Sequence, residues 1–148
     1  MDRIGRGIIA GFIATLALSA VIDPLATLAR AADVLPPTIG WVLHFVVGSF
    51  LWGATFALLE KLIPGPFWLR GILFGAGAWL VVMLAVMPLT RGGLFGIALG
   101  FAPPIAMLVI HLLYGVLLGS IYGFLLPEDD ERIRVQHDEE HHWHPLPR

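Results

Sequence analysis

The sequence predicts an all-α integral membrane protein, a four-helix bundle built by tandem duplication of a two-helix hairpin. Hydrophobic residues make up 57% of the 148 residues and charged residues only 14%, whereas an average soluble domain carries about a quarter charged residues. The charges are bunched and leave long apolar stretches between them. Two halves of the chain also share one pattern of arginine, glycine, proline and histidine.

Four transmembrane helices are expected, near residues 6–28, 38–61, 69–89 and 104–126. Each contains an uncharged apolar run close to the roughly 20 residues that one bilayer crossing needs. The last uncharged interval is longer, but the pair Pro103-Pro104 divides it. The preceding segment, 91–102, is too short to span and is expected to lie at the outer interface or to dip into the protein as a short cap.

The first helix is also compatible with a secretory signal, because Arg3 and Arg6 precede it and "ARA" at 29–31 resembles a cleavage site. The apolar run is longer than a usual signal core and has a counterpart deeper in the chain. An uncleaved helix is therefore expected. The chain has no cysteine, which excludes disulfides and thiolate chemistry.

Hairpin repeats are predicted at 5–63 and 69–126, within a transmembrane domain of residues 1–127. At an offset of 64, Arg6, Gly7, Ile8, Gly11, Ala14, Leu16 and Pro24 recur as Arg70, Gly71, Ile72, Gly75, Ala78, Leu80 and Pro88. At an offset of 67, Pro36, Pro37, Val42, His44, Gly48, Leu51, Leu58 and Leu59 recur as Pro103, Pro104, Val109, His111, Gly115, Leu118, Leu125 and Leu126. Such repeats are related by an axis along the membrane normal, so His44 and His111 are expected at equal depth.

The basic residues set the expected orientation. Only Arg30 and Arg91 flank one side of the four helices. The other side carries Arg3, Arg6, Lys61, Arg70, Arg132 and Arg134. The positive-inside rule therefore places both termini in the cytoplasm. The loop from Glu60 to Arg70 is assigned to this topology, with Phe67 and Trp68 as interfacial anchors.

Glycine rows are expected to mediate helix packing, because lipid offers helices no hydrophobic reason to associate and small residues let backbones approach. The rows consist of Gly7, Gly11, Gly48, Gly71, Gly75, Gly115, Gly119 and Gly123.

The candidate intramembrane polar site consists of His44, His111 and Asp23. Ionisable groups within the hydrocarbon region are costly and often functional. In one interpretation each neutral imidazole bonds a backbone carbonyl or a hydroxyl of a neighbouring helix. In a second, the histidines and Asp23 form a proton or ion site. In a third, the two histidines ligate b-type haem or another metal, although the glycine rows favour helices too close to admit a porphyrin.

Residues 128–148 are expected to form a solvated, largely disordered cytoplasmic tail, since seven acids accompany three arginines. Candidate ligands for a divalent metal are present in this tail: His137, His141, His142 and His144. The alternative is that these histidines only titrate.

The order of the motifs "RGIIAG", "HFVVGSFLWG", "WLRGILFGAGAW" and "HLLYGVLLGSIYG" resembles an uncharacterised bacterial family of small four-helix membrane proteins, and more distantly YagU-like inner-membrane proteins. The resemblance covers roughly residues 4–126 and leaves out the tail. It implies a four-helix architecture in the bacterial inner (cytoplasmic) membrane, and it implies no reaction.

The expected function is that of a small multi-pass, non-enzymatic accessory or assembly component. The alternatives are a proton or ion transport or relay protein, or a haem- or metal-binding protein, that uses the histidine pair. No phosphate-binding glycine loop, nucleophile elbow or zinc-protease signature supports an enzyme. The expected partners are the lipid bilayer and a second copy of the chain or a larger membrane complex, with no nucleic acid.

Overall fold

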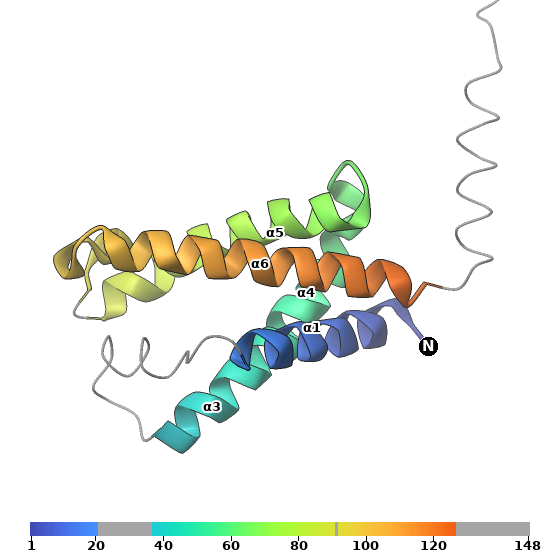
Figure 1. The fold of residues 1–148 in the computed structure, drawn as a ribbon, viewed down its shortest axis with the longest axis horizontal. Coiled ribbons are helices and arrows are strands. Elements are labelled where there is room, and N and C mark those ends of the chain that lie inside the picture. Colours follow the sequence, from blue (N-terminus) through green and yellow to red (C-terminus); the bar gives the residue numbers. More distant parts are fainter. Residues whose placement is uncertain (21–36, 91, 127–148) are drawn as a thin grey trace, which may run out of the picture.

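The computed structural model describes residues 1–20, 37–90 and 92–126, and these residues form helices and turns without any strand (Figure 1). The predicted all-α class is confirmed. In chain order the elements are α1 (Arg3–Ser19), α3 (Pro37–Val46), the π-helix η1 (Val47–Gly53), α4 (Ala54–Leu59), the 3-10 helix η2 (Glu60–Leu62), α5 (Phe67–Val81), the π-helix η3 (Val82–Val86), the 3-10 helices η4 (Met87–Leu89) and η5 (Leu94–Leu99), and α6 (Ala102–Phe124). Asp23 and the four tail histidines lie outside the described residues.

Three continuous helices are long and apolar enough to cross a membrane. They are Thr38–Leu62 with 25 residues, and Phe67–Leu89 and Ala102–Phe124 with 23 residues each. A residue adds about 1.5 Å to a helix, so each exceeds the ~30 Å hydrocarbon core of a bilayer. They coincide with the second, third and fourth predicted helices. The first predicted helix, residues 6–28, overlaps α1, which has 17 residues. Residues 21–28 are outside the described part of the chain.

Local sequence sets several helix boundaries. The Asp2 carboxylate accepts a hydrogen bond of 2.9 Å from the Gly5 N–H and so caps α1. Gly65, with φ of 98°, turns the chain between α4 and α5. Pro103 and Pro104 occupy the first turn of α6, where a missing N–H costs no intrahelical bond.

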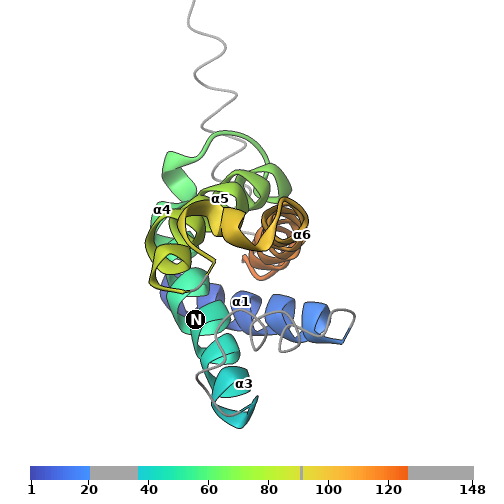
Figure 2. The ribbon, with the colours of Figure 1, turned by 90° about the vertical axis from the view of Figure 1, so that its left-hand side faces the viewer.

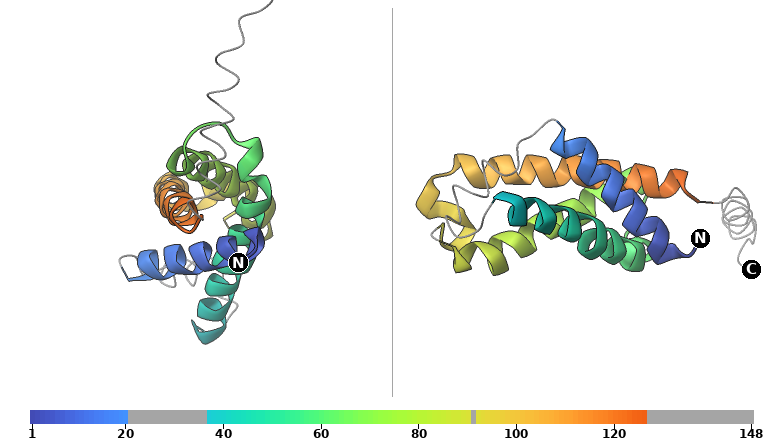
Figure 3. Two further views of the ribbon diagram at one scale, coloured as in Figure 1. Left: turned by 90° about the vertical axis from the view of Figure 1, so that its right-hand side faces the viewer. Right: turned by 90° about the horizontal axis from the view of Figure 1, so that it is seen from below.

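The helices form two pairs. Helices α5 and α6 lie side by side along most of their length (Figure 1), while α1 crosses the continuous helix formed by α3, η1 and α4 (Figure 3). In Figure 2, α6 is seen nearly end-on while α1 runs across the view, so the axes of these two helices are not parallel. Helix α1 nevertheless contacts α6 and thereby joins the two pairs.

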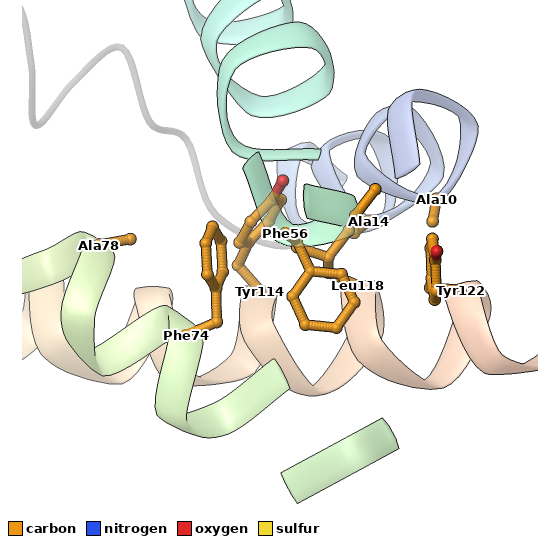
Figure 4. Close-up of a cluster of buried hydrophobic side chains, with 9 residues drawn as sticks. Ala10, Ala14, Phe56, Phe74, Ala78, Tyr114, Leu118 and Tyr122 are labelled. Atoms are coloured by element: carbon orange, nitrogen blue, oxygen red, sulfur yellow. The ribbon is translucent and has the colours of Figure 1, made fainter. Parts of the chain in front are cut away.

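One hydrophobic core lies between the pairs and receives residues from both (Figure 4). Its members are Ala10 and Ala14 of α1, Phe56 and Ala57 of α4, Phe74 and Ala78 of α5, and Tyr114, Leu118 and Tyr122 of α6. The Phe56 ring packs edge-on against both Phe74 and Tyr122, with centroids 5.3 and 5.4 Å apart. Such edge-to-face aromatic pairs are favourable beyond the area they bury.

Glycines bring the backbones of each pair into direct contact. A Cβ on Gly11 would lie 2.7 Å from the Gly48 carbonyl oxygen, and one on Gly7 would overlap the Gly53 carbonyl. In the other pair, a Cβ on Gly71 or Gly75 would overlap the carbonyl of Gly115 or His111. The helices can pack this closely only because glycine has no side chain, since real Cβ atoms do not approach a backbone at these distances.

The segment after Gly92 forms a short cap at one end of α5 and α6. The Phe95 ring contacts Trp79 at a centroid distance of 5.9 Å, and the Trp79 indole N–H donates to the Pro104 carbonyl at 3.1 Å. This geometry agrees with the expectation that residues 91–102 are too short to span.

The outward faces of the helices are apolar, with large exposed side chains such as Phe12, Phe50, Leu73 and Ile105. Within the described ranges, every charged side chain lies at the opposite end from the cap. This charged end comprises Asp2, Arg3, Arg6, Glu60, Lys61 and Arg70.

Candidate functional site

His44 links α3 to α1. Its Nε2 lies 3.1 Å from the Ser19 hydroxyl, and Ser19 in turn donates its single proton to the Thr15 carbonyl at 2.7 Å. Because that proton is already used, the imidazole must donate through an Nε2–H to the Ser19 oxygen. The rings of Trp41 and Phe45 flank His44 at 5.9 and 5.7 Å.

His111 has a different partner, although it recurs at the equivalent sequence position. Its Nδ1 lies 2.8 Å from the Met107 carbonyl of the preceding turn of α6. A carbonyl only accepts, so Nδ1 carries the proton. At the offset of 64, Met83 stands where Ser19 stands in the first half. The second half therefore offers no hydroxyl at this place, and the two imidazoles have separate contacts.

Tyr114 joins the two helix pairs through a polar contact. Its hydroxyl donates to the Gly48 carbonyl at 2.5 Å, from α6 to η1. The Thr15 hydroxyl packs against Gly48 from α1 and donates to the Gly11 carbonyl at 2.7 Å. We call Thr15, Ser19, His44, Gly48 and Tyr114 the polar cluster. Its residues come from α1, α3, α6 and the π-helix η1, and π-helical segments often mark functional positions.

The two buried tyrosines of α6 give a matched test of the polar cluster. We expect Tyr114→Phe to lower the free energy of unfolding by about 1 kcal/mol, because it removes the hydrogen bond from the tyrosine hydroxyl to the Gly48 carbonyl. Within the described part of the chain, the Tyr122 hydroxyl is buried without a hydrogen-bond partner. Tyr122→Phe is therefore expected to be neutral or stabilising. Denaturant titration of both variants in detergent micelles measures the difference, and equal losses would contradict this assignment.

A second polar group, at the charged end, centres on Glu60, whose side chain is only 1% exposed. The Arg70 Nη1 donates to Glu60 Oε2 at 2.7 Å, and Arg3 Nη2 lies 3.6 Å from Oε1. Arg3 also donates to the Ala57 carbonyl at 2.8 Å. Arg70 Nε donates to the Gly65 carbonyl at 2.6 Å. These contacts tie α1, η2 and α5 together.

Sequence reasoning missed this ion cluster, because it assigned Glu60 and Arg70 to loop topology alone. A signal was present: Glu60 is the one acidic residue between Asp33 and Glu128. A single carboxylate next to the basic side of an apolar chain is a candidate for pairing, since burying an unpaired charge is costly.

The eight glycines expected to pack all face another helix, and so does Gly53, which the glycine rows did not include. Six of the eight meet backbone atoms of the neighbouring helix. Gly48 meets the Thr15 side chain and Gly123 meets the Phe67 ring.

A metal site is not formed by the residues that the structure describes: among them, no group of three or more His, Cys, Asp or Glu side chains lies close enough to hold an ion. Of the candidate intramembrane polar site, the structure places His44 and His111, each beside its own hydrogen-bond partner.

Comparison with protein families gives one match. A family model described as "Family of unknown function (DUF6789)" covers residues 1–133. The match includes the acidic residues at 128–131 and ends before the four tail histidines. Neither the curated proteins nor the solved structures contain a match.

Proposed function

The chain belongs to the DUF6789 family, whose function is unknown, and from this premise we propose that it is a non-enzymatic accessory or assembly component of the bacterial inner membrane. In this proposal His44 and His111 are structural. The observation that carries it is their separate hydrogen bonding, His44 to Ser19 of α1 and His111 to Met107 of its own helix. A haem or a shared metal site needs both rings directed at one point.

Four spans, with α1 as the first, complete the proposed architecture. The apolar outward faces of the described helices support a lipid environment. Only the lipid bilayer and further protein, a second copy or a larger complex, suit such a surface.

The proposed tandem duplication is supported by matching contacts in the two halves. Gly11 faces Gly48, and their equivalents Gly75 and Gly115 also face each other. The nearest contacts are displaced by about one turn between the halves, since Gly7 and Gly11 meet the carbonyls of Gly53 and Gly48, whereas Gly71 and Gly75 meet those of Gly115 and His111. A π-helix has a wider turn than an α-helix, and η1 occupies this part of the first pair.

The proposed topology has a direct labelling test, because the chain contains no cysteine. Lys61→Cys and Arg148→Cys are expected to resist a membrane-impermeant maleimide in intact spheroplasts and to react after permeabilisation. Leu94→Cys, in η5 and 58% exposed, is expected to react in intact spheroplasts. The reverse pattern, or labelling of Lys61→Cys and Arg148→Cys from opposite sides, would refute four crossings with cytoplasmic termini.

A proton or ion relay is the second candidate, and one observation favours it. The hydroxyls of Thr15 and Ser19 follow one another along α1 toward His44. The Ser49 hydroxyl, next to Gly48 on η1, is buried without a partner among the described residues. Chains of hydroxyls and imidazoles can conduct protons.

Reconstitution separates the structural role from the relay and haem alternatives. Proteoliposomes with a trapped pH dye are expected to leak protons at the rate of protein-free vesicles, and the purified protein is expected to show no Soret absorption. A proton flux that His44→Ala abolishes and His111→Ala retains would replace the proposal with the relay. A Soret band that is present in the wild type and absent from His44→Ala and His111→Ala would favour haem binding over the structural role.

A further inference from the structure

The charged end of the molecule carries more positive than negative charge. Among the described residues it has four basic side chains (Arg3, Arg6, Lys61 and Arg70) and two acidic ones. The Asp2 carboxylate caps α1, and the oxygens of the Glu60 carboxylate contact the guanidiniums of Arg3 and Arg70. Arg6, only 7% exposed, adds positive charge one turn along α1. An additional anion would stabilise this arrangement electrostatically.

Arg3 has donor capacity that the described contacts do not use. A guanidinium has five N–H donors in a planar fork. Nη2 serves the Ala57 carbonyl and faces Glu60, whereas Nε is buried and has no hydrogen-bond partner within residues 1–20, 37–90 and 92–126. The buried Nε is shielded from an outside ligand, but the side chain as a whole is 41% exposed, so a ligand can reach the exposed part of Arg3.

Arg70 is held in place as a second positive group. Glu60 and the Gly65 carbonyl fix its guanidinium through bonds of 2.7 and 2.6 Å. Its Cζ also lies 5.0 Å from the centre of the Phe67 ring, a cation–π distance. The buried Glu60 carboxylate orients the guanidiniums of Arg3 and Arg70, which form a rigid basic surface. A guanidinium can donate two parallel N–H bonds to the oxygens of a phosphate.

We propose that this end binds the headgroup phosphate of an anionic phospholipid, with Arg3 as the principal contact and Arg70 as the supporting charge. The inference rests on the proposed membrane location. Lipid is favoured over free phosphate because large apolar side chains border the basic residues, with Leu62 78% and Trp68 51% exposed. Basic sites between helix ends are a recurrent mode of anionic lipid recognition.

The test is native mass spectrometry of the full-length protein in a neutral detergent, titrated with palmitoyl-oleoyl phosphatidylglycerol, with the phosphatidylcholine of the same chains, and with inorganic phosphate. Phosphatidylglycerol is expected to bind about tenfold or more tightly than phosphatidylcholine, because the free energy of one charge-assisted hydrogen bond corresponds to a ratio of this size. Inorganic phosphate at the same concentration is expected not to displace it.

Arg3→Gln is expected to remove most of this preference. Lys61→Gln is the matched control, because Lys61 is an exposed basic residue of the same end and its variant is expected to retain the preference. Circular dichroism checks that both variants keep their helix content, and the wild-type comparison of the two lipids does not depend on either variant.

Three results would overturn the lipid site: equal affinity for the two lipids, equal loss in both variants, or displacement by inorganic phosphate. Equal affinity for the two lipids excludes recognition of the headgroup charge. Equal loss in both variants means that the preference comes from the summed positive charge of this end and not from Arg3. Displacement by inorganic phosphate indicates a site for a free anion. A protein that shows the expected labelling topology but no lipid preference refutes the lipid site alone. A protein absent from the membrane fraction refutes the proposed function.

Discussion

Gly71→Val is expected to separate α5 from α6 and to lower the free energy of unfolding by about 3 kcal/mol or more. A Cβ at this position would overlap the Gly115 carbonyl and lie 3.0 Å from the Gly119 N–H. These are backbone atoms, which cannot rotate away as a flexible side chain can. Relief therefore requires the two helices to move apart along the contact that brings them together.

Gly77→Val is the matched control, because Gly77 lies on the same helix and a Cβ there would have no neighbouring atom within 4 Å. Both changes replace glycine by the same β-branched residue, so their intrinsic effects on helix formation cancel. Unfolding in mixed micelles by sodium dodecyl sulfate, followed by circular dichroism, compares the two. Similar losses in both variants would show that close backbone contact is not what holds this pair.

Glu60→Gln is expected to cost about 1.5–3 kcal/mol, because it replaces the charged partner of the partly exposed Arg3 and Arg70 guanidiniums by a neutral, buried amide. The side chain changes little in shape, so the loss reports charge rather than packing. Lys61→Gln, its exposed neighbour, is expected to change stability by no more than about 0.5 kcal/mol. The same detergent titration measures both.

A double-mutant cycle identifies the partner of Glu60. Arg70→Met alone is expected to destabilise the protein, because it removes the 2.7 Å bond to the carboxylate. Glu60→Gln combined with Arg70→Met is expected to cost less than the two single changes together. Strict additivity of the two losses would mean that the ion pair contributes no coupling to the fold.

Much of the helical framework could be predicted from the sequence, because long uncharged apolar runs have few other structures in a membrane. The starts of the second and fourth helices followed from proline pairs, and α6 indeed begins at Ala102 beside Pro103. The π-helices η1 and η3 could not be predicted. A wider turn shifts the helix register by one residue, and a continuous apolar run such as 82–86 contains no periodicity that records the shift.

The contacts of the polar residues were the least predictable part of the site. Sequence spacing places His44 and His111 in equivalent positions, but their hydrogen bonds depend on the neighbouring helix, which has Ser19 in one half and Met83 in the other. The Tyr114 bond to Gly48 joins residues 66 positions apart, and the Glu60 cluster joins three elements. Such contacts follow from how the helix pairs dock, which no local pattern specifies.

The shared hydrophobic core has a consequence for biosynthesis. Ala10 and Ala14 of α1 are translated well before Leu118 and Tyr122 of α6, which complete the same core. Helix α1 therefore exists without its neighbour α6 until the segments between them have been translated. Translation of α1 and its docking against α6 are thus separate events in time, and any factor that shields the unfinished core acts in the interval between them.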